Sequence, residues 1–381
     1  MNLKENSMST IASHNLYLYN CVKAEKIFKD KPGISNWSLT RKIYGHNGSI
    51  IDRTNTISTP FKTSNIEWLS MPLLKKNFTK TLEECCFDYA RRTIDQAVIE
   101  NKKIALMWSG GIDSTCMLVS FLSVATKDEI FRLIVLCNRD SILENPEFFQ
   151  KFLVGKITCK DSNSWYSYIN NKVIFLTGEG GDQIGWLGFT RSSNSIFNEI
   201  GWDFLKKSPT ADNIIKCLER VCGEKNVANI CFEKIINPLQ KSALISIDTI
   251  SQSLWWTIFC VKWQNVYLRV LNNYTSKDFI NNEYMKNNFK MFYQSDDIQR
   301  WCMLNNEKML WIKKFTDIKK PLKQIIFNFD KNQNYLENKI KLGSLGKLSR
   351  MGPSIGFITS DWQFLNNVNT DLYYNNKNSF I

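Results

Sequence analysis

A short run of small and polar residues separates two apolar stretches in the segment MWSGGIDSTCMLVSFL (107–122). The members that could do chemistry are Ser109, Gly110, Gly111, Asp113 and Ser114. A turn from a strand into a helix leaves backbone N–H groups unpaired, and the helix dipole favours anions at the same place. Glycines let the backbone approach a phosphate, and a carboxylate beside it is explained by a divalent cation between the two. The segment therefore predicts a phosphate-binding turn.

Two common phosphate motifs do not describe this turn. No lysine follows the glycines, as the motif G-x-x-x-x-G-K-[ST] requires, and the pattern G-x-G-x-x-G is absent here. A capped helix that follows a glycine turn and binds nothing is the structural alternative.

Hydrophobic runs around this turn predict alternating strands and helices. We expect strands at 102–108, 131–137 and 172–177. We expect helices at about 79–101, 113–125 and 145–153, and mostly helices from about residue 200 onward. This alternation is typical of an α/β protein with a doubly wound, mostly parallel sheet and a helical C-terminal region. Ligands of such sheets bind beyond the carboxyl ends of the strands, so the turns at 109–114 and 178–183 should open onto one edge.

The bulk properties favour a globular protein of 381 residues without a membrane span. Apolar residues make up 43% of the chain, and the longest apolar runs, such as 254–261, are too short to cross a bilayer. The N-terminus has no apolar signal segment, so we expect a cytoplasmic protein with no membrane partner. Eleven cysteines without a C-x-x-C pair, and only two histidines, argue against a structural zinc site; the pair Cys85 and Cys86 indicates a helix interior.

The motif SGGIDS (109–114) resembles the pyrophosphate-binding loop of the ATP pyrophosphatase, or PP-loop, family. A second segment, LTGEGGDQIGWLGF (176–189), resembles the asparagine synthetase branch of that family, which reads approximately S-G-E-G-x-D-E. Gln183 replaces the second acid of that pattern. The resemblance covers roughly residues 100–190, and more loosely 290–347.

The resemblance implies an adenine nucleotide alpha hydrolase-like fold that uses ATP and Mg²⁺. Such enzymes cleave ATP between the α and β phosphates and transfer AMP to a substrate oxygen. Asp113 and Asp182 would hold magnesium, Glu179 would act in the acceptor site, and the end of the second strand near Leu136 would face the adenine. The residues that would bind the phosphates are Ser109, Gly110, Gly111, Asp113, Ser114, Gly178 and Gly180.

Two lysine-rich stretches near the C-terminus resemble later motifs of the same branch. DIKKPLKQII (317–326) is similar to its K-x-x-L-R stretch, and NKIKLGSLGK (338–347) is similar to its R-x-K stretch. In that register Lys341 would be the catalytic lysine, and Lys320 and Lys323 would be supporting cations. Lys323 and Lys339 stand where the family prefers arginine.

The expected organisation is an N-terminal segment of unclear fold (1–78), a PP-loop ATP-binding core (79–200) and a helical part that completes the synthetase domain (201–381). Glutamine-hydrolysing relatives begin with a cysteine after the first methionine, and Asn2 stands there instead. We therefore expect the nitrogen to come from ammonia, from an amine on a substrate or from a separate amidotransferase subunit. The predicted function is an ATP-dependent ligase that adenylates a small-molecule or peptide carboxylate and passes it to an amine.

Two other functions remain open on the sequence. The net charge is +13, and residues 306–350 hold eleven basic and four acidic side chains, which suits a PP-loop enzyme that adenylates a nucleic-acid base. A solvated basic face explains the same charges. The replacements at Gln183 and at the arginine positions suit a nucleotide-binding relative without catalysis.

Overall fold

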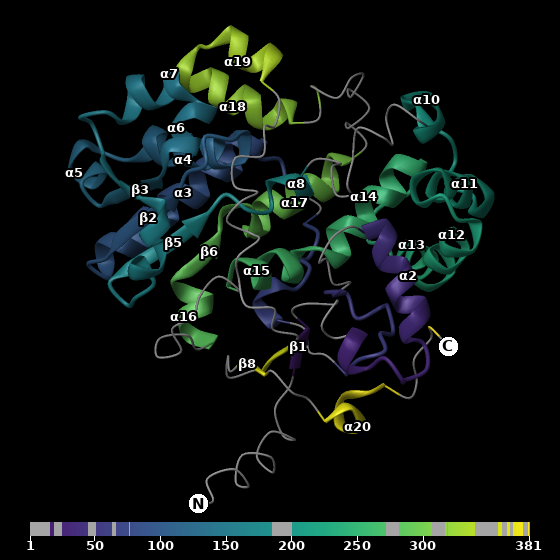
Figure 1. Ribbon diagram of the computed structural model, residues 1–381. Coiled ribbons are helices and arrows are strands. Elements are labelled where there is room, and N and C mark those ends of the chain that lie inside the picture. Colours follow the sequence, from purple (N-terminus) through teal and green to yellow (C-terminus); the bar gives the residue numbers. More distant parts are fainter. Residues whose placement is uncertain are drawn as a thin grey trace, which may run out of the picture. The chain divides into compact units, whose positions relative to one another are not determined.

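The chain forms two compact units, and each is assembled from segments that are separated in the sequence (Figure 1). Unit 1 comprises Met1–Met71, Gly188–Lys277 and Pro353–Ile381, and unit 2 comprises Pro72–Leu187 and Asp278–Gly352. The computed structural model describes residues 16–18, 25–44, 51–62, 66–75, 77–184, 200–271, 282–306, 317, 319–339, 357–359, 364–365, 369–375 and 380.

Unit 2 contains a five-stranded sheet in which all strands are parallel, so the protein belongs to the α/β class (Figure 1). The strands lie in the order β4-β3-β2-β5-β6, which is 3-2-1-4-5 along the sheet. Their bounds are β2 Lys103–Met107, β3 Leu133–Cys137, β4 Thr158–Asp161, β5 Val173–Thr177 and β6 Phe289–Met291. The parallel sheet and the strands β2, β3 and β5 confirm the predictions from the hydrophobic runs.

The strands β4 and β6 were not predicted. β4 reads TCKD and is largely exposed at one edge of the sheet, so it lacks the apolar pattern that marks a buried strand. Within the part of the chain expected to be mostly helical, β6 is a three-residue strand at the other edge. Pairing with β5 at Phe175–Thr177 defines β6, and so short a strand carries no local signal.

The central strands are covered on both faces. All five side chains of β5 are buried, as are Ile104, Ala105 and Leu106 of β2. Because successive side chains of a strand point to opposite faces, this burial requires packing on each side of the sheet.

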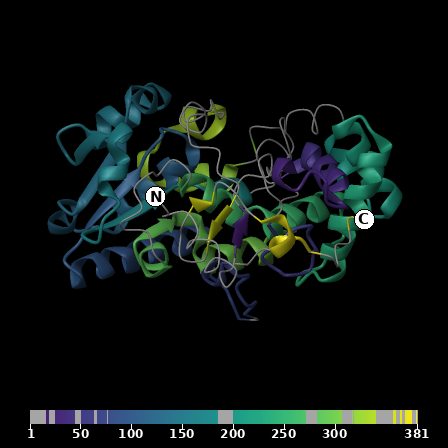
Figure 2. The same cartoon turned by 60° about the horizontal axis from the view of Figure 1, so that its bottom comes forward.

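Two predicted helices flank the first glycine turn. α3 (Leu82–Ile99) begins with a capping box between Thr81 and Glu84, and α4 (Ile112–Val124) starts at the turn itself. The two helices pack on each other, and α3 also contacts β2 (Figure 2). Cys85 and Cys86 are fully buried in α3, as the sequence indicated.

Segments far along the chain complete unit 2. α18 (Lys320–Asp330) packs on α4, and α17 (Asp296–Leu304) packs on α3 and contacts α8 (Gly181–Ile184). The predicted helix at 145–153 is present as α7 (Pro146–Phe148) followed by a π-helical turn. The remaining helices are α5 Lys127–Ile130, α6 Arg139–Glu144, α16 Asn282–Asn287 and α19 Gln333–Asn338.

Unit 1 is mostly helical and has a small antiparallel sheet of β1 (Leu16–Leu18), β7 (Phe357–Thr359) and β8 (Phe364–Leu365). All twelve residues of α14 (Ile250–Val261) are buried, so its aromatic side chains belong to the core. The other helices are α2 Ile34–Tyr44, α10 Trp202–Leu205, α11 Ala211–Cys222, α12 Lys225–Cys231, α13 Asn237–Lys241, α15 Trp263–Leu271 and α20 Thr370–Tyr373. No helix in the described part of the chain combines the length and the apolar character that a membrane crossing needs.

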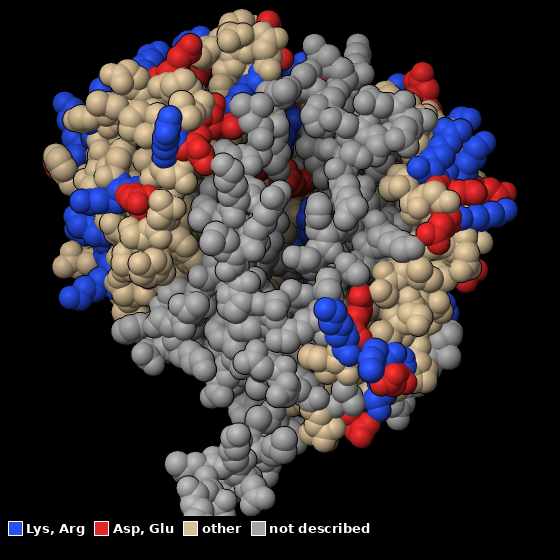
Figure 3. Space-filling view, viewed as in Figure 1, with Lys and Arg blue, Asp and Glu red and all other residues tan. Residues whose placement is uncertain are grey.

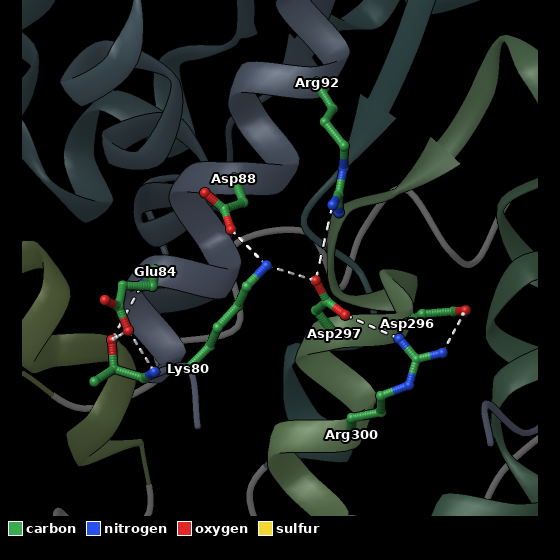
Figure 4. A network of polar contacts seen from close by, with 8 residues as sticks. Lys80, Glu84, Asp88, Arg92, Asp296, Asp297 and Arg300 are labelled. Carbon is green, nitrogen blue, oxygen red and sulfur yellow. Dashed lines mark hydrogen bonds and ion pairs between the residues drawn. The ribbon is translucent and has the colours of Figure 1, made fainter. Parts of the chain in front are cut away.

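A network of ion pairs joins α17 to α3 (Figure 4). Lys80 Nζ lies 2.7 Å from Asp88 Oδ2 and 3.1 Å from Asp297 Oδ2, and Arg300 Nη1 lies 2.9 Å from Asp297 Oδ1. Burial alone would raise the pKa of the Asp297 carboxyl. The hydrogen bond and charge of Lys80, with the hydrogen bond of Arg300 and the charge of Arg92, nevertheless hold that pKa below its usual value.

We predict that Asp297→Asn lowers the free energy of unfolding of the protein by about 1–3 kcal/mol, because it removes charged hydrogen bonds from two cations. The neighbouring variant Asp296→Asn is the matched control. The Asp296 side chain is largely exposed and pairs only with Arg300 in the network, so its loss should cost less than about 1 kcal/mol.

The contribution of Asp297 to the free energy of unfolding depends on pH. A carboxyl whose pKa is lowered by folding contributes stability above its unfolded pKa, which is near 3.8, and loses it as the pH falls through the folded pKa. The difference between the native chain and Asp297→Asn should therefore shrink below about pH 3.8 in denaturant titrations. A difference that stayed constant down to about pH 2 would contradict the assignment.

Candidate functional site

The two glycine segments leave from neighbouring strands at the point where the order of the sheet reverses. β2 lies next to β5, with Met107 opposite Thr177, but β2 leads to β3 on one side and β5 lies next to β6 on the other. In α/β sheets, ligands bind in the crevice beyond the carboxyl ends of the strands at this switch point. The prediction that both turns open onto one edge of the sheet is thus confirmed.

The first turn is closely packed and depends on its glycines. Gly110 has a φ of +73°, and a β-carbon there would overlap the carbonyl oxygen of Ser141. Gly111 has an extended conformation and caps the N-terminus of α4 without a side-chain bond. Only glycine fits at position 110, because both the backbone conformation and the space exclude a side chain.

Hydrogen bonds of Ser109 and Ser114 stabilise the first turn. The Ser109 backbone N–H donates to Ser114 Oγ at 3.0 Å, and the two hydroxyl oxygens lie 2.9 Å apart. The Gly111 N–H donates to Ser109 Oγ at 3.3 Å. These bonds fix the shape of the turn; phosphate contacts from Ser109 and Ser114 stay predictions.

The second turn lies directly against the first. A β-carbon at Gly178 would lie 2.7 Å from Ser114 Cα, and one at Gly181 would lie 2.5 Å from Asp113 Cγ. Gly180 has a φ of +93°, a conformation that side chains disfavour. The glycines at 178 and 181 therefore allow two turns that are distant in the sequence to touch.

The carboxylates of Asp113 and Asp182 meet around one ammonium group, that of Lys319. Lys319 Nζ lies 2.6 Å from Asp113 Oδ1, 2.5 Å from Asp113 Oδ2 and 2.6 Å from Asp182 Oδ1. The exposed fractions of these side chains are 6% for Lys319, 20% for Asp113 and 28% for Asp182. The two acids predicted to act together are thus brought together by the fold.

The sequence pattern indicated Lys320 and Lys323 as supporting cations, whereas the cation that the structure places beside these acids is Lys319. Lys320 is exposed as the first residue of α18, and Lys319 precedes the helix and is buried. The missed signal lies in the K-x-x-L-R pattern itself: counted back from Leu322, its first lysine is Lys319. Lys323 is also buried, and its ammonium donates to the Leu336 carbonyl at 3.1 Å.

The donor set of this site fits Mg²⁺ that arrives with phosphates. Magnesium prefers oxygen ligands, and it is usually held by one or two carboxylates together with water and substrate phosphate oxygens. Among the described residues there is no cluster of three or more His, Cys, Asp or Glu side chains that could hold a metal ion. The carboxylates of Asp113 and Asp182 match the one or two carboxylates that Mg²⁺ takes from a protein when it is shared with phosphates.

Two aromatic side chains support the first turn: Trp108, which directly precedes it, and Tyr293, from a distant segment. The hydroxyl of Tyr293, which is fully buried, donates to the Asp113 carbonyl at 2.7 Å. Trp108 Nε1 donates to Thr115 Oγ1 at 3.0 Å. Burial, together with the neighbouring Cys116 and Asp113 side chains, raises the pKa of Tyr293, so the hydroxyl keeps its proton for this bond.

A second buried ion pair lies behind the first turn. Lys339 Nζ lies 2.7 Å from Glu144 Oε1 and also donates to the Glu144 carbonyl at 2.8 Å. The Glu144 side chain approaches Gly110, where an added β-carbon would lie 2.7 Å from Glu144 Cβ. Glu144 was not predicted from the sequence, because nothing local distinguishes it from other glutamates.

The other predicted residues are placed as follows. The Glu179 side chain is half-buried, and its backbone N–H donates to Thr177 Oγ1 at 3.3 Å. Leu136 is fully buried in β3, and its carbonyl accepts from the Trp108 N–H at 2.9 Å. Lys341 lies outside the described residues, so its predicted catalytic role stays a prediction.

Comparison with protein-family models, with curated proteins and with solved structures finds no match to this chain.

We predict that Gly178→Ala lowers the free energy of unfolding by about 3 kcal/mol, because its methyl group would overlap the backbone of Ser114. Gly155→Ala is the control in the same unit. Gly155 has a φ of +70° but no heavy atom within 4 Å of the place where a β-carbon would lie, so only backbone strain of about 1–2 kcal/mol is expected. Equal losses for the two variants in denaturant titrations would show that the turns do not touch.

Proposed function

We propose that this chain is an asparagine synthetase-like ligase that forms an amide with ATP. It would adenylate a substrate carboxylate, release pyrophosphate and pass the acyl group to ammonia or another amine. The observation that carries this proposal is the convergence of Asp113 and Asp182 on one ammonium at the switch point of the sheet. The finer fold that goes with it is the doubly wound, adenine nucleotide alpha hydrolase-like arrangement, which the strand order 3-2-1-4-5 supports.

The proposed roles follow from position and charge. The backbone N–H groups at the start of α4 bind the leaving diphosphate, because the first N–H groups of a helix have no partners within it and the helix dipole favours an anion there. Asp113 and Asp182 hold Mg²⁺, which neutralises charge on the diphosphate when it is bound. Lys319 supplies one positive charge at the same place, and Glu179 acts in the acceptor site, the role that the resemblance gives it.

Gln183 has a physical explanation within this proposal. It is 1% exposed, whereas the Asp182 side chain is 28% exposed. A carboxylate at the buried position would need an opposite charge to offset its desolvation, whereas a neutral amide needs only hydrogen bonds. Gln183 therefore replaces an acid at a buried position, and the more exposed carboxylates of Asp113 and Asp182 remain.

The distribution of charge bears on the nucleic-acid alternative. On the face of the protein in Figure 3, the lysines and arginines of the described residues alternate with aspartates and glutamates. Several of the basic residues counted in 306–350, among them Lys308, Lys313 and Lys341, lie outside the described residues. Binding of nucleic acid thus draws its support from the sequence alone, and the ligase remains the proposal that the geometry supports best.

The direct test is equilibrium binding of a non-hydrolysable ATP analogue, which needs no knowledge of the acceptor. We expect binding in the presence of Mg²⁺, and a loss of affinity of about tenfold or more in Asp113→Asn and Asp182→Asn. Asp140→Asn is the control, because Asp140 is exposed in α6 and should leave the affinity unchanged. Undiminished binding to both site variants would refute the proposed function.

A further inference from the structure

The Lys319 ammonium occupies the place between the carboxylates of Asp113 and Asp182 where the proposed metal would bind. The Lys319 ammonium donates to both carboxylate oxygens of Asp113 and forms an ion pair with Asp182 Oδ1, and all three oxygens lie within 2.6 Å of Lys319 Nζ. The single positive charge offsets half of the charge of the two carboxylates. A divalent ion bound between the same oxygens would have to take the place of this ammonium.

The backbone of Lys319 is fixed by the helix that follows it, and its ammonium lies at the end of a long side chain. Lys319 precedes α18, whose packing on α4 holds that helix beside the first turn, and the Lys323 N–H donates to the Lys319 carbonyl at 3.0 Å. A lysine carries its charge at the end of four methylene groups, so rotations of the side chain alone can carry it away from the carboxylates.

We propose that Lys319 is a built-in counter-ion that couples the binding of a divalent metal to the binding of a nucleoside triphosphate. The site binds each of them weakly alone and both of them tightly together. The inference rests on the proposed function, since it concerns the same site. In this inference, Lys319 controls the order in which the metal and the triphosphate bind and couples the two binding steps.

The coupling follows from the charges. A metal ion alone must displace the ammonium, which then has no anion to receive it. A triphosphate alone meets two carboxylates whose charge Lys319 only partly offsets. When both arrive, the metal takes the carboxylate oxygens and the ammonium finds phosphate oxygens, so each ligand raises the affinity for the other by the same factor.

The experiment uses Mn²⁺ as the probe, because it shares the oxygen-ligand preference of Mg²⁺ and its free form can be counted by electron paramagnetic resonance. The full chain is titrated with Mn²⁺, with and without a non-hydrolysable ATP analogue. The variants are Lys319→Met and Lys319→Gln, which remove the charge, and Lys127→Met, which removes an exposed lysine in α5. Circular dichroism checks that each variant is folded.

In the native chain and in Lys127→Met, we expect the analogue to tighten Mn²⁺ binding by about fivefold or more. In Lys319→Met or Lys319→Gln, we expect Mn²⁺ alone to bind at least about fivefold more tightly than to the native chain, with a smaller effect of the analogue.

A folded Lys319 variant that binds Mn²⁺ alone no more tightly than the native chain would overturn the inference. Equal Mn²⁺ affinity of the native chain with and without bound analogue would also overturn it. If the analogue binds to no form of the protein, the proposed function fails instead. The titrations with Mn²⁺ alone would still decide whether Lys319 competes with a metal, so the two failures are distinguishable.

Discussion

The candidate site depends on close contact between two glycine turns that lie far apart in the sequence. Gly178 and Gly181 leave no room for a β-carbon against Ser114 and Asp113, and this contact brings the carboxylates of Asp113 and Asp182 to the same ammonium. Two acids held near each other would repel, so a cation between them is an electrostatic requirement of the arrangement. Lys319 meets that requirement in the protein as it stands.

The same contact explains why segments from the second half of the chain belong to unit 2. α18 carries Lys319 to the first turn, and Tyr293 holds the carbonyl of Asp113. Lys339 pairs with Glu144 behind Gly110. Each of these groups satisfies a charge or a polar atom near the turn, which is what a buried polar site needs to be stable. The glycine turns thus bring the acidic side chains together, and residues after position 290 provide the groups that pair with them.

Much of this site follows from the sequence, because its main signals are local. Apolar runs marked β2, β3 and β5, and the glycines after β2 and β5 marked the turns where backbone and ligand could approach. Parallel strands have their carboxyl ends at one edge, so the meeting of Asp113 and Asp182 could be expected from the order of strands and turns along the chain. The resemblance to one family added roles to these residues but no geometry.

What could not be predicted depends on long-range packing. β6 is a strand only because β5 lies beside it, and β4 is polar because it lies at an edge. Lys319 is an exception, because the K-x-x-L-R pattern counted back from Leu322 selects it rather than Lys320. The partnership of Glu144 with Lys339 links residues almost two hundred positions apart.

If Asp113 and Asp182 bind one metal ion shared with the diphosphate of a nucleotide, a crystal structure with Mg²⁺ and a non-hydrolysable ATP analogue will show the ion between them. We expect a metal peak coordinated by both carboxylates, phosphate oxygens at the N-terminus of α4 and Lys319 Nζ withdrawn from between the acids. A nucleotide bound elsewhere, or bound there with Lys319 still between the two carboxylates, would be incompatible with a shared metal at this site.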